Sequence, residues 1–405
     1  MARYPFRRAP LASFVVAAAV LTLAFPVLGG AALNTGESAA VITSPTCGQT
    51  ITADVRLETD LACADVTALI VGASKITIDL NGHSISCHGP GAGGSCQCRD
   101  ADPFDECLGP EPDVGIDVLP GHDRVRIKGV GTISGFDFGV RLIGGSRNEI
   151  EDLLISSPVP DTEADRGETA GIHVSSTSCD GKTPTLSVVG NEISHHTTGI
   201  AGVDAGCTLV KRNLIVWNSS ITRCATGISY EHGVRNTFVG NTLMHNGFGF
   251  LCDGGMVLST AGSTVRRNVA ARNDGDGIVV GGSLNEIVRN TSSEHSVFSG
   301  LRITGDDNTV SRNVVTDTPG DDIPRSAFSV VGQRNTVRRN VSLRNGTGLY
   351  ATGGLNEIAR NTLLESSLVD AAGEDPTDLW DPNNICETQT TPVPPPGVCN
   401  PGEGA

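Results

Sequence analysis

The chain has 405 residues, of which 50 are glycine and only 4% are aromatic. This composition suits many short turns around a thin core and argues against one thick globular core. The net charge of -16, from 29 basic and 45 acidic residues, argues against nucleic acid or an anionic membrane as a general partner.

The first 32 residues are typical of a secretory signal peptide. Arg7 and Arg8 precede an uncharged apolar run over 11–28, and small residues follow over 29–32. We expect cleavage near Ala32 and a protein that is secreted or periplasmic. No later stretch is long and apolar enough to span a bilayer, so we predict no membrane span.

Two columns of residues repeat along the rest of the chain. A phrase of the form N-x-[VI]-x-R-N recurs with a minimum period of 21 to 23 residues. Its last residue forms the column Asn191, Asn213, Asn241, Asn268, Asn290, Asn313, Asn340 and Asn361. A second column pairs a small residue with an apolar one in ten places, from Gly115-Ile116 through Gly249-Phe250 to Gly348-Leu349. Short segments rich in Val, Ile and Thr lie between them, which indicates strands and turns.

The repeats predict an all-β fold, a right-handed parallel β-helix of ten coils. Leucine-rich repeats share the period, but their spaced leucines and helical stripe are missing. The predicted helix covers 76–370, with a cysteine-rich insertion at 87–113, an N-terminal cap at 33–75 and a C-terminal cap and tail at 371–405. Identical positions should stack ~4.8 Å apart, and the column asparagines should hydrogen-bond along the axis. We expect a monomer.

The segments at 47–52, 76–85 and 380–386 carry a family resemblance. They are similar to the N-terminal cap, first coil and C-terminal closure of the secreted β-helix repeat proteins of the pectin-lyase-like superfamily. The resemblance implies the fold and export. Since the known enzymes of the superfamily act on carbohydrate, it also favours an acidic polysaccharide as the partner.

All 12 cysteines follow the signal peptide, and in an oxidising compartment an even number favours disulfides. Cys179 and Cys207 each lie eight residues after a column glycine, so they should stack and pair. By similar spacing from the column asparagines we pair Cys224 with Cys252. The resemblance to capped β-helices implies two local closures, Cys47 with Cys63 and Cys386 with Cys399. Three connectivities stay open for Cys87, Cys96, Cys98 and Cys107.

The insertion offers the alternative of a metal site. Its cysteines, with His83 and His88, suit copper or zinc, and its spaced carboxylates, Asp100, Asp102, Asp105 and Glu106, suit Ca²⁺. The resemblance includes a copper-related branch, the periplasmic β-helix proteins of nitrous-oxide reductase maturation. Because cysteines in exported loops are usually oxidised, we assign no metal ligands here.

A candidate catalytic set comes from residues that share columns. Glu231 and Asp253 each lie four residues past a column glycine, which predicts consecutive coils and a carboxylate pair with divided acid and base roles. The alternative is two solvated turn residues. Four residues past the column asparagines, His195 and His245 flank Trp217, which could stack on a sugar ring or pack against a loop.

An arginine precedes the column asparagine in six places, at Arg212, Arg267, Arg289, Arg312, Arg339 and Arg360. The last five form an unbroken stack, in which like charges repel unless they are neutralised. An anionic polymer bound at Arg289, Arg312 and Arg339 would neutralise them, and so would Glu286, Glu357 and the acidic loops.

Two functions of different classes follow from these candidates. The first is binding or processing of polysaccharide by a lyase, epimerase or hydrolase that uses Glu231, Asp253, His195 and His245. The second is a non-catalytic extracellular scaffold or glycan-binding rod, for which stable repetition suffices. A periplasmic copper-related protein is a further alternative.

Overall fold

The computed structural model describes residues 41–64, 66–87, 113–157, 169–177, 179, 183–219, 225–247, 254–296, 298–318, 326–373, 375–387 and 400–401. They belong to one compact unit, Ala39–Ala405. Among them, no helix is long and apolar enough to cross a membrane.

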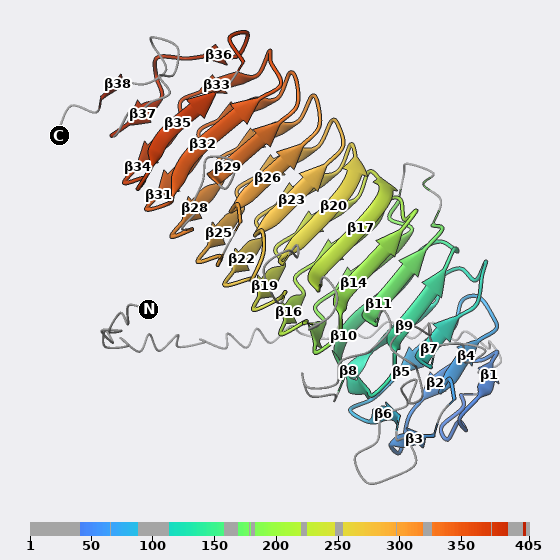
Figure 1. The fold of residues 1–405 in the computed structure, drawn as a ribbon. Coiled ribbons are helices and arrows are strands. Elements are labelled where there is room, and N and C mark those ends of the chain that lie inside the picture. Colours follow the sequence, from blue (N-terminus) through green and yellow to red (C-terminus); the bar gives the residue numbers. More distant parts are fainter. Residues whose placement is uncertain are drawn as a thin grey trace, which may run out of the picture. The chain divides into compact units, whose positions relative to one another are not determined.

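The chain winds into a right-handed parallel β-helix with three strand rows, as predicted (Figure 1). Sheet 1 has 13 parallel strands whose neighbours follow chain order. Its strands are β1 (Gln49–Ile51), β4 (Leu69–Val71), β7 (Val114–Val118), β9 (Phe138–Ile143), β11 (Ala170–Ser175), β14 (Thr198–Val203), β17 (Thr226–Val234), β20 (Met256–Ala261), β23 (Ile278–Gly281), β26 (Leu301–Thr304), β29 (Ser326–Val331), β32 (Thr347–Thr352) and β35 (Val369–Gly373).

The other two rows consist of shorter strands. Sheet 2 contains β2 (Val55–Arg56), β5 (Thr77–Asp79), β12 (Leu186–Val189), β15 (Thr208–Lys211), β18 (Thr237–Val239), β21 (Thr264–Arg266), β24 (Glu286–Val288), β27 (Thr309–Ser311), β30 (Thr336–Arg338), β33 (Glu357–Ala359) and β36 (Leu379–Trp380). Sheet 3 contains β3 (Leu61–Cys63), β6 (Ser84–Cys87), β13 (Glu192–Ser194), β16 (Leu214–Val216), β19 (Thr242–Met244), β22 (Val269–Ala271), β25 (Thr291–Ser293), β28 (Val314–Thr316), β31 (Val341–Leu343), β34 (Thr362–Leu364), β37 (Ile385–Cys386) and β38 (Asn400–Pro401). The long strands β8 (Arg126–Ser134) and β10 (Asn148–Ser156) pass through both sheets.

Three turns close each coil. Turn A joins sheet 2 to sheet 3, turn B joins sheet 3 to sheet 1, and turn C joins sheet 1 to sheet 2. In most coils a residue with positive φ is followed by a buried polar side chain at each turn, as at Arg312 (φ 58) and Asn313. Because few L-residues favour this conformation, the hydrogen bonds of the following residue must hold it in place.

The asparagine ladder of turn A provides those bonds, as the sequence predicted. Asn313 Nδ2 donates to Asn340 Oδ1 at 3.0 Å and to the Ile287 carbonyl at 3.0 Å. The ladder starts at Asn191 and continues one step beyond the predicted column, where Asn361 donates to Asn384. Burial of these side-chain amides costs little because both the NH₂ group and the carbonyl oxygen of each amide are hydrogen-bonded.

Glycine stands near the start of most sheet 1 strands because the neighbouring coil leaves no room for a Cβ atom there. At Gly199 a Cβ would lie 2.5 Å from the Gly227 carbonyl oxygen and 2.5 Å from Ile215 Cγ2. After Gly227-Ile228 the column continues at Gly255-Met256, since Ile228 pairs with Met256. The predicted position at Gly249-Phe250, which lies outside the described residues, is therefore wrong.

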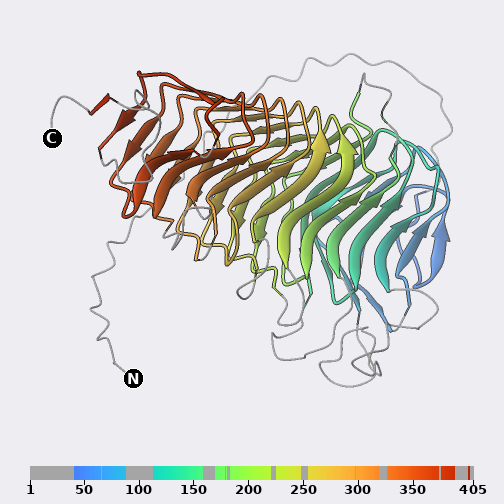
Figure 2. The ribbon, with the colours of Figure 1, turned by 45° about the horizontal axis from the view of Figure 1, so that its top comes forward.

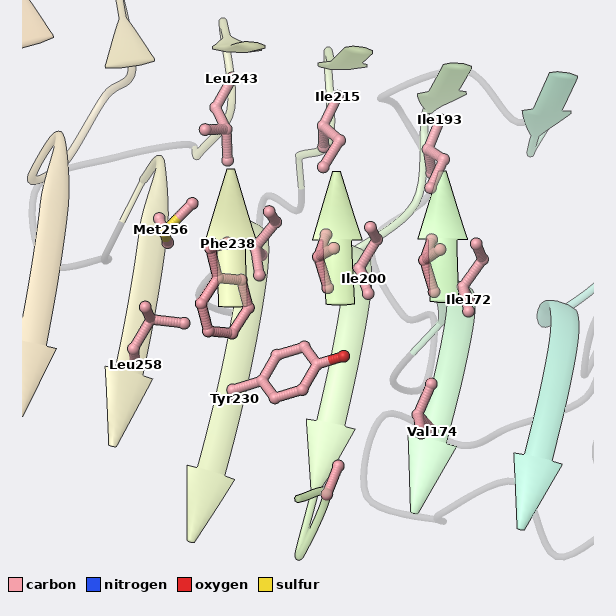
Figure 3. Packing of buried hydrophobic residues seen from close by; sticks show 14 of the residues in the cluster. Ile172, Val174, Ile193, Ile200, Ile215, Tyr230, Phe238, Leu243, Met256 and Leu258 are labelled. Carbon is pink, nitrogen blue, oxygen red and sulfur yellow. The ribbon is translucent and has the colours of Figure 1, made fainter. Parts of the chain in front are cut away.

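A thin apolar core runs along the axis between the three sheets. Stacked aliphatic side chains such as Ile172 and Ile200 from sheet 1 face Ile193 and Ile215 from sheet 3 (Figure 3). Thirteen strands in sheet 1 exceed the ten predicted coils, because β1 and β4 within the predicted N-terminal cap, and β35 at the C-terminal boundary, continue the stack.

Two predicted disulfides are confirmed. Cys47 bonds to Cys63, with Cα atoms 5.7 Å apart, and Cys179 bonds to Cys207, with Cα atoms 5.2 Å apart. Cys87 and Cys386 are also disulfide-bonded. The predicted pair Cys224–Cys252 and the predicted partner Cys399 lie outside the described residues, as do Cys96, Cys98 and Cys107.

Candidate functional site

A groove of about 690 Å³ lies on the outer face of sheet 1, across β9, β11, β14, β17 and β20. Figure 2 shows these strands side by side, from the teal to the yellow part of the ribbon. Its lining consists of Phe138, Thr169, Ala170, His173, Thr197, Thr198, Ala201, Gly202, Val203, Thr226, Ser229, Glu231 and Val257.

The groove arises from small side chains in a stacked outward row. Strand pairing places His173, Ala201, Ser229 and Val257 at the same position of four consecutive coils. The two small members lie between the larger His173 and Val257, so the surface is hollowed over β14 and β17. Because successive strands are ~4.8 Å apart, a hollow two coils wide can admit a ring-sized group.

The lining is rich in hydroxyl groups and poor in charge. Thr169 and Thr197 hydrogen-bond to each other through their hydroxyls at 3.3 Å. The His173 ring packs against Phe138 with centroids 5.2 Å apart. Glu231 is exposed and lies at a β-bulge of β17, between Tyr230 and Gly233. Bulges often re-aim a side chain at a binding site, and Glu231 is the carboxylate among the described lining residues.

The register around Glu231 differs from the one that predicted a carboxylate pair. Glu231 pairs with Val203 on one side, and on the other side the bulge sets Glu231 and His232 against the single residue Ser259 of β20. Asp253 lies outside the described residues and precedes β20 by three positions in the sequence. The column register behind the prediction is wrong, because the column resumes at Gly255 and its position four residues later is Ser259. That Asp253 lies near Glu231 stays a prediction.

The predicted aromatic row exists in turn B. The Trp217 and His245 rings are stacked, with centroids 4.1 Å apart and planes 4° apart. The His195 backbone N–H donates to the Trp217 carbonyl at 3.2 Å, and Trp217 remains 53% exposed. The described lining of the groove contains Glu231 but neither His195 nor His245, so the four predicted catalytic residues do not form one described cluster.

The arginine row is confirmed in turn A. Arg289, Arg312 and Arg339 are exposed and have φ values of 57°, 58° and 56°. Among the described residues, no carboxylate lies within ion-pair distance of these guanidinium groups. The predicted neutralisation by Glu286 and Glu357 is therefore not found.

Comparison with known proteins places the chain in a family. The family described as periplasmic copper-binding protein (NosD) matches residues 161–391, more than half of the chain. The chain belongs to this family. No curated protein matches the sequence.

Solved β-helix structures resemble this NosD-family chain at low sequence identity. The surface adhesin PfbA of Streptococcus pneumoniae is 11% identical with a TM-score of 0.51, over 81% of this chain and 82% of the adhesin. The periplasmic alginate epimerase AlgG is 11% identical with a TM-score of 0.48, over 82% of this chain and 74% of AlgG. The A-module of the mannuronan C-5 epimerase AlgE4 of Azotobacter vinelandii is 14% identical with a TM-score of 0.43, over 83% of this chain and 85% of the module. These similarities concern the fold.

The described residues of this NosD-family protein do not fit a copper site. Copper needs several imidazole, thiolate or thioether donors brought together. No group of three or more His, Cys, Asp or Glu side chains in the described part of the chain could hold a metal ion. His195 and His245 lie two coils apart, about 9.6 Å by strand spacing, with Trp217 between them. Residues 88–112, with His88 and the acidic run, lie outside the described ranges.

Sequence reasoning missed His173, Ala201 and Ser229. A signal for them was present, because each lies two residues past a column glycine. With Gly255 as the next column glycine, the residues two positions past each glycine show Ala201 and Ser229, both small, between His173 and Val257. The hydroxyls of Thr169 and Thr197 belong to loop positions with no repeat signature of their own.

Proposed function

We propose that this NosD-family protein is exported and binds polysaccharide, with a short saccharide segment held in the groove across β11, β14 and β17. The observation that carries the proposal is the hollow over Ala201 and Ser229, bordered by His173 and Glu231. Its volume of about 690 Å³ is typical of sites for small ligands.

The chemistry of the lining supports a saccharide. Sugars present many hydroxyl groups that both donate and accept hydrogen bonds, as the hydroxyls of Thr198, Thr226 and Ser229 do. The rings of His173 and Phe138 add an apolar surface of the kind on which the C–H face of a sugar packs. Together they provide directional bonds and apolar contact in one groove.

Processing of the bound saccharide is the second candidate, and Glu231 favours it. The groove brings this carboxylate and the His173 imidazole to one surface, and these are the usual side chains for moving protons. A lyase, an epimerase or a hydrolase would each need them. A scaffold without ligand needs neither, so binding and turnover measurements separate the three functions.

A groove-filling variant tests the binding proposal. Val203 lines the groove and is 37% exposed, whereas Val331 occupies the same column outside it and is 40% exposed. We expect Val203→Trp to weaken binding to neutral and uronic-acid polysaccharides at least about tenfold, because the indole would occupy the ligand volume. Titration calorimetry with purified protein measures the affinity.

Val331→Trp is the matched control, since it adds the same side chain to the same sheet. It should keep wild-type affinity, and both variants should keep the wild-type thermal midpoint. Equal affinity of the two variants for a polysaccharide that the wild type binds would contradict the groove as the site. A wild type that binds no saccharide of the panel would favour the scaffold.

A further inference from the structure

We propose that the arginine row of turn A is a second ligand site, separate from the groove, which binds an acidic polysaccharide along the helix axis. The row consists of Arg212, Arg267, Arg289, Arg312, Arg339 and Arg360. Turn A lies between sheets 2 and 3, whereas the groove lies on the outer face of sheet 1. The inference therefore goes beyond the proposed function and does not depend on it.

The backbone does not require arginine at these positions. Each arginine of the row has a positive φ, between 54° and 58°, a conformation that glycine adopts without strain. Gly240 occupies the equivalent place, before Asn241, in the coil between Arg212 and Arg267, with φ 65°. The turn therefore forms equally well without a side chain at this position. The conformation of the turn does not explain why arginine recurs there.

The described residues do not neutralise the row. Within the described residues, none of its six guanidinium groups lies within 4.0 Å of a carboxylate. Three arginines with the same backbone conformation in turns B and C are paired: Arg272 with Glu294 at 2.9 Å, Arg334 with Asp307 at 2.8 Å and Arg344 with Asp317 at 2.7 Å. Arg147 and Arg235 of turn C are also without an ion pair among the described residues, but only turn A stacks such arginines on consecutive coils.

Neighbouring residues increase the positive charge of the row. Arg266 and Arg338, the residues before Arg267 and Arg339, end strands of sheet 2 and are also exposed. This basic stripe contrasts with the net charge of -16 for the whole chain. A local cluster of like charges on an acidic protein is costly unless a ligand of opposite charge occupies it.

The spacing of the row suits a linear polymer with separated charges. Five arginines, from Arg267 to Arg360, lie on consecutive coils, so they repeat every ~4.8 Å over about 19 Å. Guanidinium groups bind carboxylates and sulfates in a bidentate manner. A polysaccharide with one acidic group on successive sugars can meet several arginines at once.

A denser polyanion fits less well. Along the axis of a duplex each nucleic acid strand carries one phosphate every ~3.4 Å, a denser charge than that of the arginine row, and the second strand would bring further phosphates against an acidic surface. A polysaccharide with fewer charges per length avoids much of that repulsion. We therefore expect an acidic polysaccharide to occupy the arginine row.

Two triple variants of equal charge test the site. Arg289→Gln, Arg312→Gln and Arg339→Gln remove unpaired cations, and Arg272→Gln, Arg334→Gln and Arg344→Gln remove the same number of paired ones. Binding to polygalacturonate is measured by calorimetry between about 20 and 200 mM salt. We expect the first triple to bind at least about tenfold more weakly at low salt, with a flatter salt dependence, because fewer counterions are released. The second triple should bind like the wild type.

Several outcomes would overturn the proposal. One is unchanged binding of the first triple, and another is an equal loss in both triples, which would indicate net charge alone. A wild type that binds duplex DNA or vesicles with anionic lipid more tightly than polygalacturonate, with the arginine dependence confined to those ligands, would assign the row to another polyanion. In a Val203→Trp background the first triple should still weaken polygalacturonate binding by the same factor, because the two sites are separate.

Discussion

At the scale of single residues, Glu231 is the carboxylate of the proposed saccharide site among its described lining residues. It is exposed at the bulge of β17 and shares the groove with His173 and a set of hydroxyl groups. Its strand partner is Val203 on one side and the bulge faces Ser259 on the other, so no carboxylate of the described strands stacks on it. A two-carboxylate mechanism with Asp253 therefore has no support in the described residues, and Glu231 would act with an imidazole or alone.

This assignment predicts the behaviour of Glu231→Gln. If the groove processes uronic-acid polymers, the substitution should lower turnover at least ~100-fold, because a general acid or base is lost while the shape of the side chain is kept. Ultraviolet absorbance of unsaturated products and assay of reducing ends measure turnover. Glu286→Gln, which removes an exposed glutamate from sheet 2, is the control and should keep wild-type activity. Full turnover in Glu231→Gln would make Glu231 a surface residue only.

At the scale of elements, turn B shows how a ladder tolerates a change of residue. Asn246 donates to Asn273, but in the next coil His295 takes the place of asparagine. Its Nδ1 accepts from the Asn273 N–H at 3.4 Å, and its Nε2 lies 2.8 Å from Ser292 Oγ, whose hydroxyl donates to the Gly300 carbonyl. The network requires a neutral ring with its proton on Nε2. Burial lowers the pKa of His295 to about 4.

The lowered pKa predicts a loss of stability in mild acid. In the unfolded chain the histidine pKa is about 6.5, so between pH 6.5 and 4 the unfolded state binds a proton that the folded state refuses. The free energy of unfolding should therefore fall as the pH falls through this range, by up to a few kcal/mol from this group. His295→Asn should weaken that dependence, because an amide continues the ladder without titrating. Urea unfolding at pH 7 and 4.5 measures both proteins, and equal pH dependence would contradict the argument.

At the scale of the whole molecule, stability depends on how many neighbours a coil has. Each inner strand of sheet 1 pairs with a strand on both sides, whereas β1 pairs with β4 alone among the described strands. The Cys47–Cys63 bridge closes a loop of 16 residues in the first coils, and Cys179–Cys207 links inner coils 28 residues apart. In the chain-entropy model these loop lengths differ by only ~0.5 kcal/mol in stabilisation. The number of neighbours should decide which bridge matters more.

Reduction should therefore loosen the first coil before the inner ones. We expect Cys47→Ala with Cys63→Ala to lose hydrogen-exchange protection in β1 to β3, while Cys179→Ala with Cys207→Ala keeps protection in β11 and β14. Hydrogen exchange followed by mass spectrometry measures both. Greater loss around β11 and β14 than at the first coil would contradict the argument from neighbours.

The sequence by itself determined the features that repeat. Identical positions of a β-helix stack, so a column read from the sequence is a column in space. For this reason the asparagine ladder of turn A, the rows of His195, Trp217 and Arg312, and the Cys179–Cys207 bridge all followed from counting residues.

Only the tertiary structure decided at which residue each coil begins and which side chains of other turns and coils lie opposite a given residue. Both Gly249-Phe250 and Gly255-Met256 satisfy the small-then-apolar pattern, and backbone pairing with Ile228 selects the second. With that choice the column position four residues past the glycine is Ser259 and not Asp253. The sequence also left open which arginines form ion pairs and where the surface is hollowed at Ala201. Both depend on side chains from different turns and coils, and a single column does not give the distances between them.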